Sequence, residues 1–563
     1  MDQEKKLSKV EYIKQSSNYL RGTIEEALAD DSTHFSEENI QVLKFHGTYQ
    51  QDDRDLRRQL TKEGKERHYM MMIRARIPGG VLSADQYLQF DKLADEYGNG
   101  TMRVTTRQTF QLHGILKSNL KATIRGINDV LITTLGGCGD QVRNIVGCAA
   151  PHEGPFYDAV RQDLLAVVDA TSAKTHAYHE IWLDGERVDP AVDAANETLY
   201  GESYLPRKFK IAFAYEGDNC ADVYSNDIAV IAHRDGDSVA GYTLAIGGGM
   251  GRTASDKQTA PHLAKAFCFV EPSELVEVCK TVIAIQRDHG NRENRKFARM
   301  KYLVANKGIA WFREEAARRL GYELKQPRDI EWTTSDDHLG RMESPSGKVH
   351  LGLFIQNGRI HDVEGMSLKS VLREIMIAYQ PQVRLTTQQN LILANLSPEA
   401  ADEIEQMLHE AGVKLAEEHT QLRLRSMACP AMPTCGLAIA ESERALPAVI
   451  DDLEKTLHEI GLGEQPISVR MTGCANGCAR PYIAEIGFVG RVIGKYDLLL
   501  GANVEGTRTN QLFREMVPVH ELVPTLRPLL EAYRDERQAG ESFGDYCSRV
   551  GIERLQDRFV PVS

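Results

Sequence analysis

The sequence predicts an α+β protein of several domains, built around an internal duplication. Two segments, MRVTTRQTFQL (102–112) and VRLTTQQNLIL (383–393), align without gaps and share Arg, Thr, Thr and Gln at the same offsets. Each follows an apolar run that ends in a glycine turn, at 68–80 and 349–359. Strand-like runs recur up to about residue 517, where terminal helices begin. We therefore expect two copies of a strand–helix–strand module related by a pseudo-twofold axis.

Composition limits the class of protein. The chain has 563 residues, 42% of them hydrophobic and 26% charged, which is enough for several domains of roughly 100 to 200 residues each. A net charge of −13 argues against nucleic-acid binding, because that requires clustered Lys and Arg. The charged N-terminus and the absence of any apolar run near ~18 residues predict a cytoplasmic protein without a membrane span.

Four cysteines form two close pairs near the C-terminus, Cys429 and Cys435 in SMACPAMPTCG and Cys474 and Cys478 in MTGCANGCARP. The prolines and glycines around them allow the backbone to fold back and bring the thiols together. Four thiolates suit an iron–sulfur cluster or a tetrahedral zinc ion, but the five-residue gap in the first pair is longer than zinc sites favour. Disulfides and four separate buried thiols are the other interpretations.

The remaining cysteines are too few and too scattered for a disulfide framework. We expect them to be buried or incidental: Cys138, Cys148, Cys220, Cys268, Cys279 and Cys547. The glycine run IGGGMGRT (246–253) resembles a dinucleotide loop only superficially, because it lacks the GxGxxG spacing and the downstream acidic residue. Close backbone approach to a large flat ligand explains this run equally well.

The first copy of the repeat carries a ladder of polar residues. If 102–113 is one strand, alternate side chains lie on opposite faces. One face is apolar and suits a core. The other carries hydrogen-bond donors, namely Arg103, Thr105, Arg107, Thr109, Gln111 and His113. Such a face suits a ligand with many carboxylates, and an ordinary solvated strand face is the alternative.

Several short basic motifs could meet a small anion. Arg and Lys supply the planar fork and the compact cation that oxyanions require. Each of these residues alone is an ordinary solvated charge, but together they would form an oxyanion cage if the fold gathers them. They are Arg74 and Arg76 in IRARIPGG, Arg143 in QVRNIVG, and Arg207, Lys208 and Lys210 in YLPRKFK.

Motifs spread in order through nearly the whole chain resemble the sulfite and nitrite reductase family, and within it the hemoprotein (beta) subunits of assimilatory sulfite reductase. They are SNYLRGT (17–23), FHGTYQQDDRD (45–55), RIPGGV, RVTTRQTFQLHGILK (103–117), YLPRKFK, QRDHGNR (286–292), SMAC (426–429) and TGCANGC (472–478). The resemblance implies a three-domain α+β fold in which ferredoxin-like and siroheme-binding α/β modules repeat about a pseudo-twofold axis.

The same resemblance implies the division of the chain. Residues 1–60 would be an N-terminal extension that wraps the core or docks a partner. Ferredoxin-like half-domains would occupy 61–140 and 336–420. The siroheme and substrate domain would be 141–335, and the domain that binds the cluster and siroheme would be 421–563.

The family binds siroheme and a [4Fe–4S] cluster. Carried over to matching positions, Cys429, Cys435, Cys474 and Cys478 hold the cluster, and Cys478 is also the bridge to the siroheme iron. Asn476 matches a residue near the haem. The polar ladder from Arg103 to His113 falls on the strand that contacts siroheme in the family.

The family's substrate cage matches Arg74, Arg143, Lys208 and Lys210. The implied activity is six-electron reduction of sulfite to sulfide, in sulfur assimilation and cysteine biosynthesis. A siroheme nitrite reductase is the alternative, but those relatives typically have Asn at the second position of the KxK pair, so Lys210 favours sulfite. A non-catalytic iron–sulfur or zinc scaffold is a hypothesis from another class.

Electrons must come from a partner, because no segment resembles a flavin or NADPH domain. The N-terminal motifs resemble forms that pair with an NADPH-dependent flavoprotein subunit, and ferredoxin is the alternative donor. Two departures from the family pattern concern the site. GCGDQVRN (137–144) replaces an Asn-rich form just before Arg143, and Ala475 replaces a common Pro.

Overall fold

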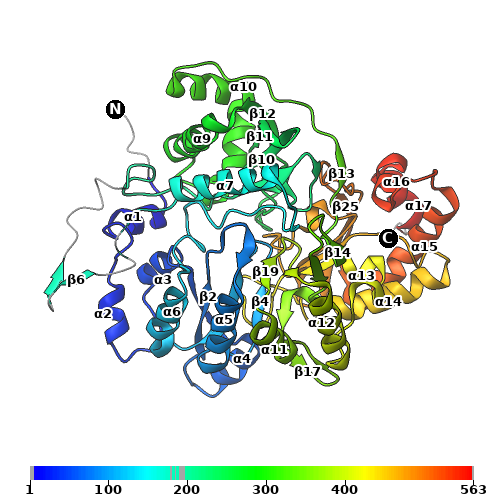
Figure 1. The fold of residues 1–563 in the computed structure, drawn as a ribbon, viewed down its shortest axis with the longest axis horizontal. Helices are drawn as coiled ribbons and strands as arrows, with labels where there is room; N and C mark the ends of the chain where they lie inside the picture. Colours follow the sequence, from blue (N-terminus) through cyan, green and yellow to red (C-terminus); the bar gives the residue numbers. More distant parts are fainter. Residues whose placement is uncertain (1–5, 176, 178–180, 184–185, 189–196, 561–563) are drawn as a thin grey trace.

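The computed structural model describes residues 6–175, 177, 181–183, 186–188 and 197–560. Helices and strands are mixed throughout these ranges, so the α+β prediction is confirmed (Figure 1). No helix in this described part is both long and apolar enough to cross a membrane.

The first repeat forms a five-stranded sheet covered by helices. Its strands, in spatial order, are β1 (Thr48–Asp52), β2 (Tyr69–Arg74), β5 (Phe110–Ile115), β4 (Met102–Val104) and β16 (Arg359–Ile360). Helix α5 (Ala84–Glu96) begins at a capping box between Ser83 and Gln86, which satisfies backbone N–H groups of its first turn. Helix α6 (Leu120–Asp129) packs beside it.

The second repeat has the same architecture. Its strands, in order, are β14 (Gly340–Glu343), β15 (Val349–Leu353), β20 (Leu391–Leu396), β19 (Gln382–Leu385) and β3 (Val81–Leu82). Helices α11 (Leu368–Tyr379) and α12 (Pro398–Glu410) belong to it. Each sheet takes its last strand from the other repeat, since β16 pairs with β4 and β3 pairs with β19. One apolar core runs through both repeats, and the predicted duplication is confirmed.

Two glycines sit at equivalent points where the repeats cross. Gly80 (φ +74°) approaches the backbone of the second repeat, and a Cβ there would lie 2.6 Å from Leu385 O. Gly358 (φ +76°) approaches the first repeat, and its Cβ would lie 2.3 Å from Val104 O. Both positions need positive φ and no side chain, so the exchange of strands depends on these two residues being glycine.

The prediction of one continuous strand over 102–113 is wrong. The segment is a β-hairpin, in which β4 pairs with β5 and Arg103 lies opposite Gln111. Gln108 makes the turn with φ 50°, and its buried amide donates to Gly147 O at 2.9 Å and to Leu385 O at 2.8 Å. The polar residues Arg103 and Gln111 still share one face of the hairpin, because they lie directly opposite each other on β4 and β5. The partners of Gln108 are distant in the chain, so the local pattern could not reveal the turn.

Two larger α/β modules carry the rest of the molecule. The sheet of the first has the order β12 (Lys265–Val270), β11 (Ser238–Ile246), β10 (Ile228–Asp235), β8 (Ile211–Tyr215), β9 (Gly217–Asp218) and β13 (Trp332–Thr334). The sheet of the second has the order β21 (Ser426–Ala428), β22 (Val469–Thr472), β23 (Ile486–Val492), β24 (Lys495–Leu500) and β25 (Gln511–Pro518).

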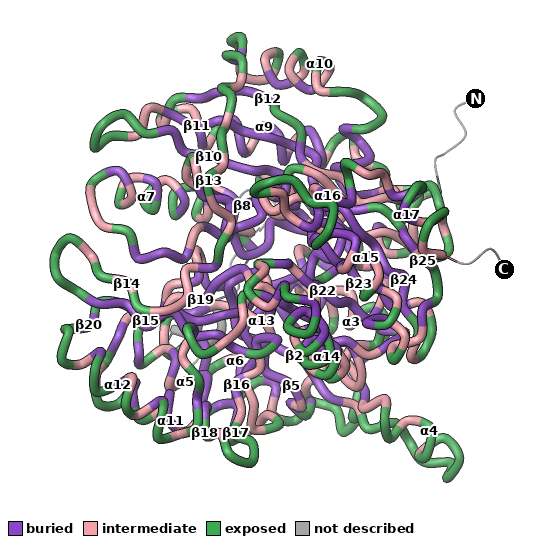
Figure 2. Tube along the Cα trace, turned by 90° about the vertical axis from the view of Figure 1, so that its right-hand side faces the viewer, coloured by how far each residue is buried: buried purple, intermediate pink, exposed green. Residues whose placement is uncertain are grey.

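These two modules also repeat each other. In each, two parallel strands are followed by two antiparallel ones, and a helix follows the last strand. That helix is α9 (Leu275–His289) in the first module and α15 (Leu522–Glu536) in the second. Figure 2 shows that the strands of both modules are largely buried, whereas helix α4 (Arg54–Lys62) lies exposed at the periphery.

The N-terminal segment contacts two of these parts. In helix α1 (Lys9–Gln15), the buried Lys14 ammonium donates to Glu11 at 2.6 Å and to Leu205 O at 2.7 Å. At the start of α4, Arg54 Nη1 donates to Cys435 O at 3.2 Å. This segment therefore lies along the core from the first α/β module to the cysteine-bearing loop.

Replacing Gly358 with Ala should destabilise the protein more than the same change at Gly461. Both glycines have φ +76°, but no atom lies within 4 Å of a Cβ at Gly461. Gly461→Ala should cost about 1–2 kcal/mol for the left-handed backbone alone, and Gly358→Ala should cost several kcal/mol more because its Cβ meets Val104 O. The urea unfolding midpoints of the two variants measure the difference. Equal midpoints would contradict the close approach.

Candidate active site and cluster-binding residues

The four predicted cluster cysteines lie at one edge of the second α/β module. Cys429 directly follows β21, and Cys474 comes just after the parallel neighbour β22. Parallel neighbours end at the same edge of a sheet, so the turns that follow them meet. Burial raises the pKa of Cys429, and Cys478, Cys435 and Cys474 also contribute to that shift. The four thiols are therefore close enough to act on one another.

The separation of these thiols distinguishes a cluster from a zinc ion. Among the described residues, no three of the four sulfur atoms lie within 4.8 Å of one another. Four thiolates on one zinc ion, with bonds of about 2.3 Å, would be only about 3.8 Å apart. Nitrogen donors also face the sulfurs, with Gly473 N 3.4 Å from Cys429 Sγ and Asn476 Nδ2 3.5 Å from Cys474 Sγ. This donor set fits an iron–sulfur cluster.

Several residues of the polar ladder already make hydrogen bonds within the protein. Arg103 is buried and donates from Nε to Glu443 at 3.1 Å and from Nη2 to Ala428 O at 2.8 Å. Thr109 Oγ1 donates to Ala75 O at 2.6 Å, and Thr105 Oγ1 accepts from the backbone of Arg107. These residues hold the hairpin against its surroundings, and their contact with siroheme stays a prediction.

The rest of the ladder leaves buried polar atoms without partners. Both ring nitrogens of His113 and Nε of Arg107 are buried and make no hydrogen bond. Burial and the cations Arg359 and Arg103 hold the pKa of His113 well below its ordinary value, so its imidazole is neutral. Orphaned buried polar groups are costly, and a bound ligand rich in carboxylates would satisfy them. The hairpin thus fits the predicted macrocycle.

Three of the predicted cage residues lie close enough to affect one another. Burial and the cations Arg207 and Arg143 hold the pKa of Lys208 well below 10.5, and Cys478 acts in the opposite direction. Burial, Arg107 and Lys208 lower the pKa of Lys210 in the same way. These mutual effects show that Arg143, Lys208 and Lys210 lie near one another, with Lys208 near Cys478.

Arg74 lies near Arg143, because both affect the pKa of Tyr49, which burial raises; Arg76 has other partners. Arg74 Nη1 donates to Cys138 Sγ at 2.8 Å. With the amide of Gln111 turned so that its oxygen faces Arg74, that oxygen also accepts from Arg74 Nε at 3.1 Å. Arg76 is buried and donates instead to Ser172 Oγ at 2.7 Å, so it holds the loop after helix α7 (Pro155–Ala170).

The unusual loop before Arg143 is firmly held. Arg143 donates from Nε and Nη2 to Gly139 O at 3.2 Å. Asp140 is buried and binds Arg295 at 2.8 Å and Arg207 at 3.6 Å. Burial alone would raise the pKa of Asp140, but Arg295 and Lys14 hold it well below its ordinary value. The loop is therefore fixed by an ionised carboxylate inside a set of cations.

The glycine run packs against protein backbone rather than serving a dinucleotide. Arg252 N donates to Ala475 O at 2.9 Å, next to the second cysteine pair. Carbonyls of the run accept from Lys301 Nζ, Gly249 O at 3.1 Å and Gly251 O at 2.6 Å. The run thus supports the Cys474–Cys478 turn from the first α/β module.

Comparison with known proteins decides the family. A model described as the nitrite and sulphite reductase 4Fe-4S domain matches residues 166–324, and one described as the nitrite/sulfite reductase ferredoxin-like half domain matches 62–130 and 341–411. The chain is 45% identical to the NADPH sulfite reductase hemoprotein beta-component of Staphylococcus haemolyticus, over 98% of this chain and 96% of that protein. This chain belongs to the sulfite reductase hemoprotein family.

Other relatives agree with this assignment. The protein of the same description from Geobacillus kaustophilus is 45% identical over 97% of this chain and 96% of its own length. A solved structure of the Mycobacterium tuberculosis NirA protein has a TM-score of 0.79 and 24% identity, with 98% of each chain covered, and shows the same fold. This sulfite reductase hemoprotein is an oxidoreductase subunit whose cofactors are siroheme and a [4Fe–4S] cluster, as the sequence resemblance implied.

Sequence reasoning missed the residues that orient this hemoprotein's site. Arg299 forms a buried ion pair with Asp227 at 2.9 Å, and Asp227 accepts from the backbone of Lys210 at 2.9 Å. Glu443 binds Arg103 and, at 2.7 Å, Arg359. The basic stretch around Arg299 was a visible signal, but no local pattern marked Asp227 or Glu443, since their partners are far away in the chain.

Replacing Glu443 with Gln should destabilise this hemoprotein by about 3–5 kcal/mol at neutral pH, because Arg103 and Arg359 would lose their buried counter-charge. Burial alone would raise the pKa of Glu443, but Arg103 and Arg359 hold it below 4.5. The ion pair therefore stabilises the fold above that pH and loses its effect as the carboxylate is protonated. Urea unfolding at pH 7 and at decreasing pH should show the difference from wild type narrowing.

The control for this change is Glu441→Gln. Glu441 pairs with the half-exposed Arg444, and such surface pairs contribute about 0–1 kcal/mol. If the two variants lost equal stability at pH 7, the structural role of Glu443 would be disproved.

Proposed function

We propose that this chain catalyses the six-electron reduction of sulfite to sulfide, as the hemoprotein subunit of an NADPH-linked sulfite reductase. The observation that supports the proposal is the proximity of three predicted cage residues. After burial, Arg143 contributes to the lowered pKa of both Lys208 and Lys210, and the Cys478 thiol also affects the pKa of Lys208. The relatives with 45% identity are sulfite reductase hemoprotein components by name.

The overall reaction fixes what the residues must supply. One hydrogen sulfite ion takes up six electrons and six protons and gives one hydrosulfide ion and three water molecules. When bound, siroheme would supply an iron that takes the sulfur atom, and the cluster on the four cysteines would supply electrons one at a time. The chain must therefore bind an anion, stabilise negative charge on its oxygens and deliver protons.

The cage residues divide these tasks by their chemistry. Arg74 and Arg143 stay protonated and offer fixed N–H donors to the sulfite oxygens. Lys208 and Lys210 have pKa values well below 10.5 because of burial and neighbouring cations, so their ammonium groups give up protons more readily than ordinary lysines. We propose that the lysines protonate the departing oxygens while the arginines hold the anion.

Two alternatives make different predictions about the purified protein. A non-catalytic zinc scaffold would be colourless, whereas a siroheme protein absorbs visible light strongly. If protein that is fully loaded with siroheme and the [4Fe–4S] cluster fails to oxidise a reduced dye in the presence of sulfite, the enzyme proposal is disproved. A siroheme nitrite reductase would show the higher kcat/KM with nitrite, and Lys210 favours sulfite over this alternative.

We propose an NADPH-dependent flavoprotein subunit as the electron donor, and ferredoxin as the alternative. The named relatives are NADPH-linked. Activity measured with each purified donor at equal concentration would decide between them. Faster reduction with ferredoxin would overturn the choice.

Replacing Lys210 with Asn should shift substrate preference toward nitrite. The change removes one cation from the cage, and sulfite needs more charge neutralisation than the smaller, singly charged nitrite. The ratio of kcat/KM for sulfite to that for nitrite should fall by about tenfold or more, which corresponds to about 1.4 kcal/mol. Lys307→Asn, on the exposed side of helix α10 (Met300–Leu320), should leave the ratio unchanged. An unchanged ratio in Lys210→Asn would remove its assigned role.

Sulfite binding should take up protons and weaken as pH rises. Burial and neighbouring cations lower the pKa of Lys210, so part of its population is neutral below pH 10.5, and a bound anion restores the charge. Calorimetry of the loaded enzyme in buffers of different ionisation enthalpy measures this uptake. Lys210→Arg should reduce it, because Arg stays protonated, whereas the titration of sulfite itself is common to both enzymes. Equal uptake in the two enzymes would contradict the assignment.

A further inference from the structure

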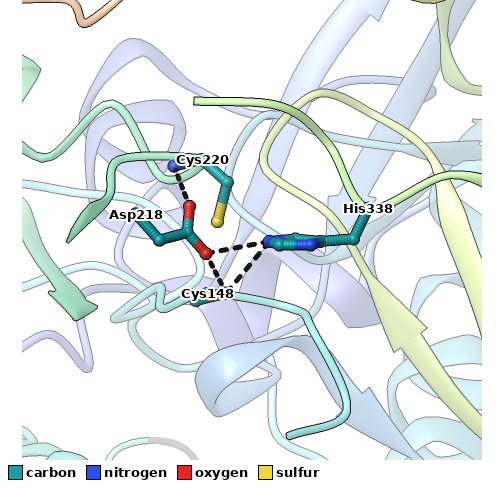
Figure 3. A group of neighbouring side chains, drawn as sticks. All are labelled: Cys148, Asp218, Cys220 and His338. Carbon is teal, nitrogen blue, oxygen red and sulfur yellow. Dashed lines mark hydrogen bonds and ion pairs between the residues drawn. The ribbon is translucent and has the colours of Figure 1, made fainter. Parts of the chain in front are cut away.

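A second thiol-containing group lies away from the proposed active site. Figure 3 shows Cys148, Asp218, Cys220 and His338 turned toward one another from three separate segments. One ligand atom from each residue lies within 4.8 Å of those from the other three. Cys148 and Cys220 are expected from the sequence to be buried or incidental. Cys220 is buried, but the two thiols are not scattered, because the fold brings them together.

This group occupies the position in the first α/β module that the cluster cysteines occupy in the second. The strand registers show the correspondence, since Ile211 pairs with Ile228 in one module and Val469 with Ile486 in the other, at the same spacing. The same offset aligns Cys220 with Cys478. The segment before each sheet aligns similarly, because Val146 pairs with Ala212 and Met427 with Arg470, which places Cys148 on Cys429.

Local contacts repeat together with the thiols. Thr106 Oγ1 donates to Cys478 O at 3.2 Å, and the equivalent Thr387 Oγ1 donates to Cys220 O at 2.7 Å. A residue in the left-handed region follows each thiol two positions later, Asp222 with φ 47° and Arg480 with φ 52°. The two thiol sites are therefore copies of one framework.

The copy in the first module cannot hold a macrocycle. The positions equivalent to Gln111 and His113 are Ile392 and Ala394, which are fully buried and pack with Ala149. Two of the six positions of the polar ladder are thus apolar in this copy, which removes polar partners that the carboxylates of a macrocycle would need.

The remaining ligands also differ from those of a cluster. Cys474 is replaced by Glu216, and Asn476 by Asp218, whose Oδ1 accepts from Cys220 N at 2.9 Å. Its Oδ2 stays directed at the group, 2.9 Å from His338 Nε2 and 3.2 Å from Cys148 Sγ. Cys148 Sγ lies 3.5 Å from His338 Nε2. The separation of 3.5 Å between Cys148 and His338 matches the edge of a tetrahedron, about 3.3–3.8 Å for metal–ligand bonds of about 2.0–2.3 Å. The two Asp218 contacts are shorter than such an edge and lie at hydrogen-bond distance.

We propose that Cys148, Cys220, Asp218 and His338 bind one zinc ion. Two thiolates, an imidazole and a carboxylate are a donor set that zinc accepts, and four protein ligands leave no open position, so the ion is structural. The separation of the ligand atoms distinguishes this site from the wider cysteine set beside the active site.

The ion would fasten the connection between two parts of the molecule. His338 lies in the segment between β13 and β14, where it leaves the first α/β module for the second repeat. Cys148 and the Asp218–Cys220 turn belong to that module itself. His338 has φ 31°, an uncommon conformation for a residue with a side chain, and a metal bond would hold it there.

Metal analysis of the untagged, fully loaded enzyme tests the proposal. Zinc and iron are measured together by plasma mass spectrometry, and we expect about one zinc ion per chain in addition to the iron. Cys148→Ser/Cys220→Ser should lose this zinc and keep its iron. The matched control is Cys279→Ser, a fully buried thiol in helix α9, which should keep both metals.

X-ray absorption at the zinc edge gives a second measurement on the wild-type enzyme, so the test does not depend on whether the double variant folds. Two sulfur and two nitrogen or oxygen neighbours are expected. The proposal is overturned if the loaded enzyme lacks zinc, if its extra metal is iron, if zinc stays in the folded double variant, or if Cys148 and Cys220 form a disulfide. Because iron content and sulfite reduction are read separately, failure here leaves the proposed function untouched.

Discussion

Glu443 joins three parts of the molecule whose relative position decides the site. Its carboxylate binds Arg103 in β4 and Arg359 in β16, which comes from the second repeat. Arg103 also donates to Ala428 O, and Glu443 N donates to Cys429 O at 3.1 Å. A buried network of this kind adds little net stability, but it orients its members strictly because each donor needs its partner. The hairpin of β4 and β5 and the strand that precedes Cys429 are thereby held together.

A second ion pair marks the relation between the two α/β modules. Asp222 and Arg480 occupy equivalent positions in the duplicated framework, and they bind each other at 2.7 Å. Two equivalent residues can touch only if they lie at the pseudo-twofold axis. Arg470 shares the same carboxylate at 2.8 Å, so these charges are paired. Burial is the largest cause of the lowered pKa of Lys208 and Lys210, and the charges that act on them next are cations. This region therefore has an excess of basic residues for an anion in a chain of net charge −13.

Spacing in the sequence singled out the four cysteines, and the resemblance to the family selected the cage residues, whereas neither could identify long-range partners. The spacing of the four cysteines from Cys429 to Cys478 fits only a few types of site. A zinc site is disfavoured because, among the described residues, no three of their sulfur atoms lie within 4.8 Å of one another. The hairpin at 102–113 was read as one strand because Gln108, which makes the turn, takes its partners from Gly147 and Leu385. Arg76 alternates with Arg74 in the sequence, but it binds Ser172. Alternation along a strand predicts the face on which a side chain lies, but not the residue that it contacts.

The duplicated modules also show how one framework can diverge into two kinds of site. Both copies keep two thiols and the threonine hydrogen bond to the backbone carbonyl of the second cysteine. What differs is the surface that faces them. One copy has Gln111 and His113, whose ring nitrogens are unpaired, and the other has buried Ile392 and Ala394 at the equivalent positions. An apolar surface excludes a ligand that carries many carboxylates, because each would be desolvated without a partner. The electrostatic character of that surface, more than the thiols themselves, therefore decides which copy can take the macrocycle.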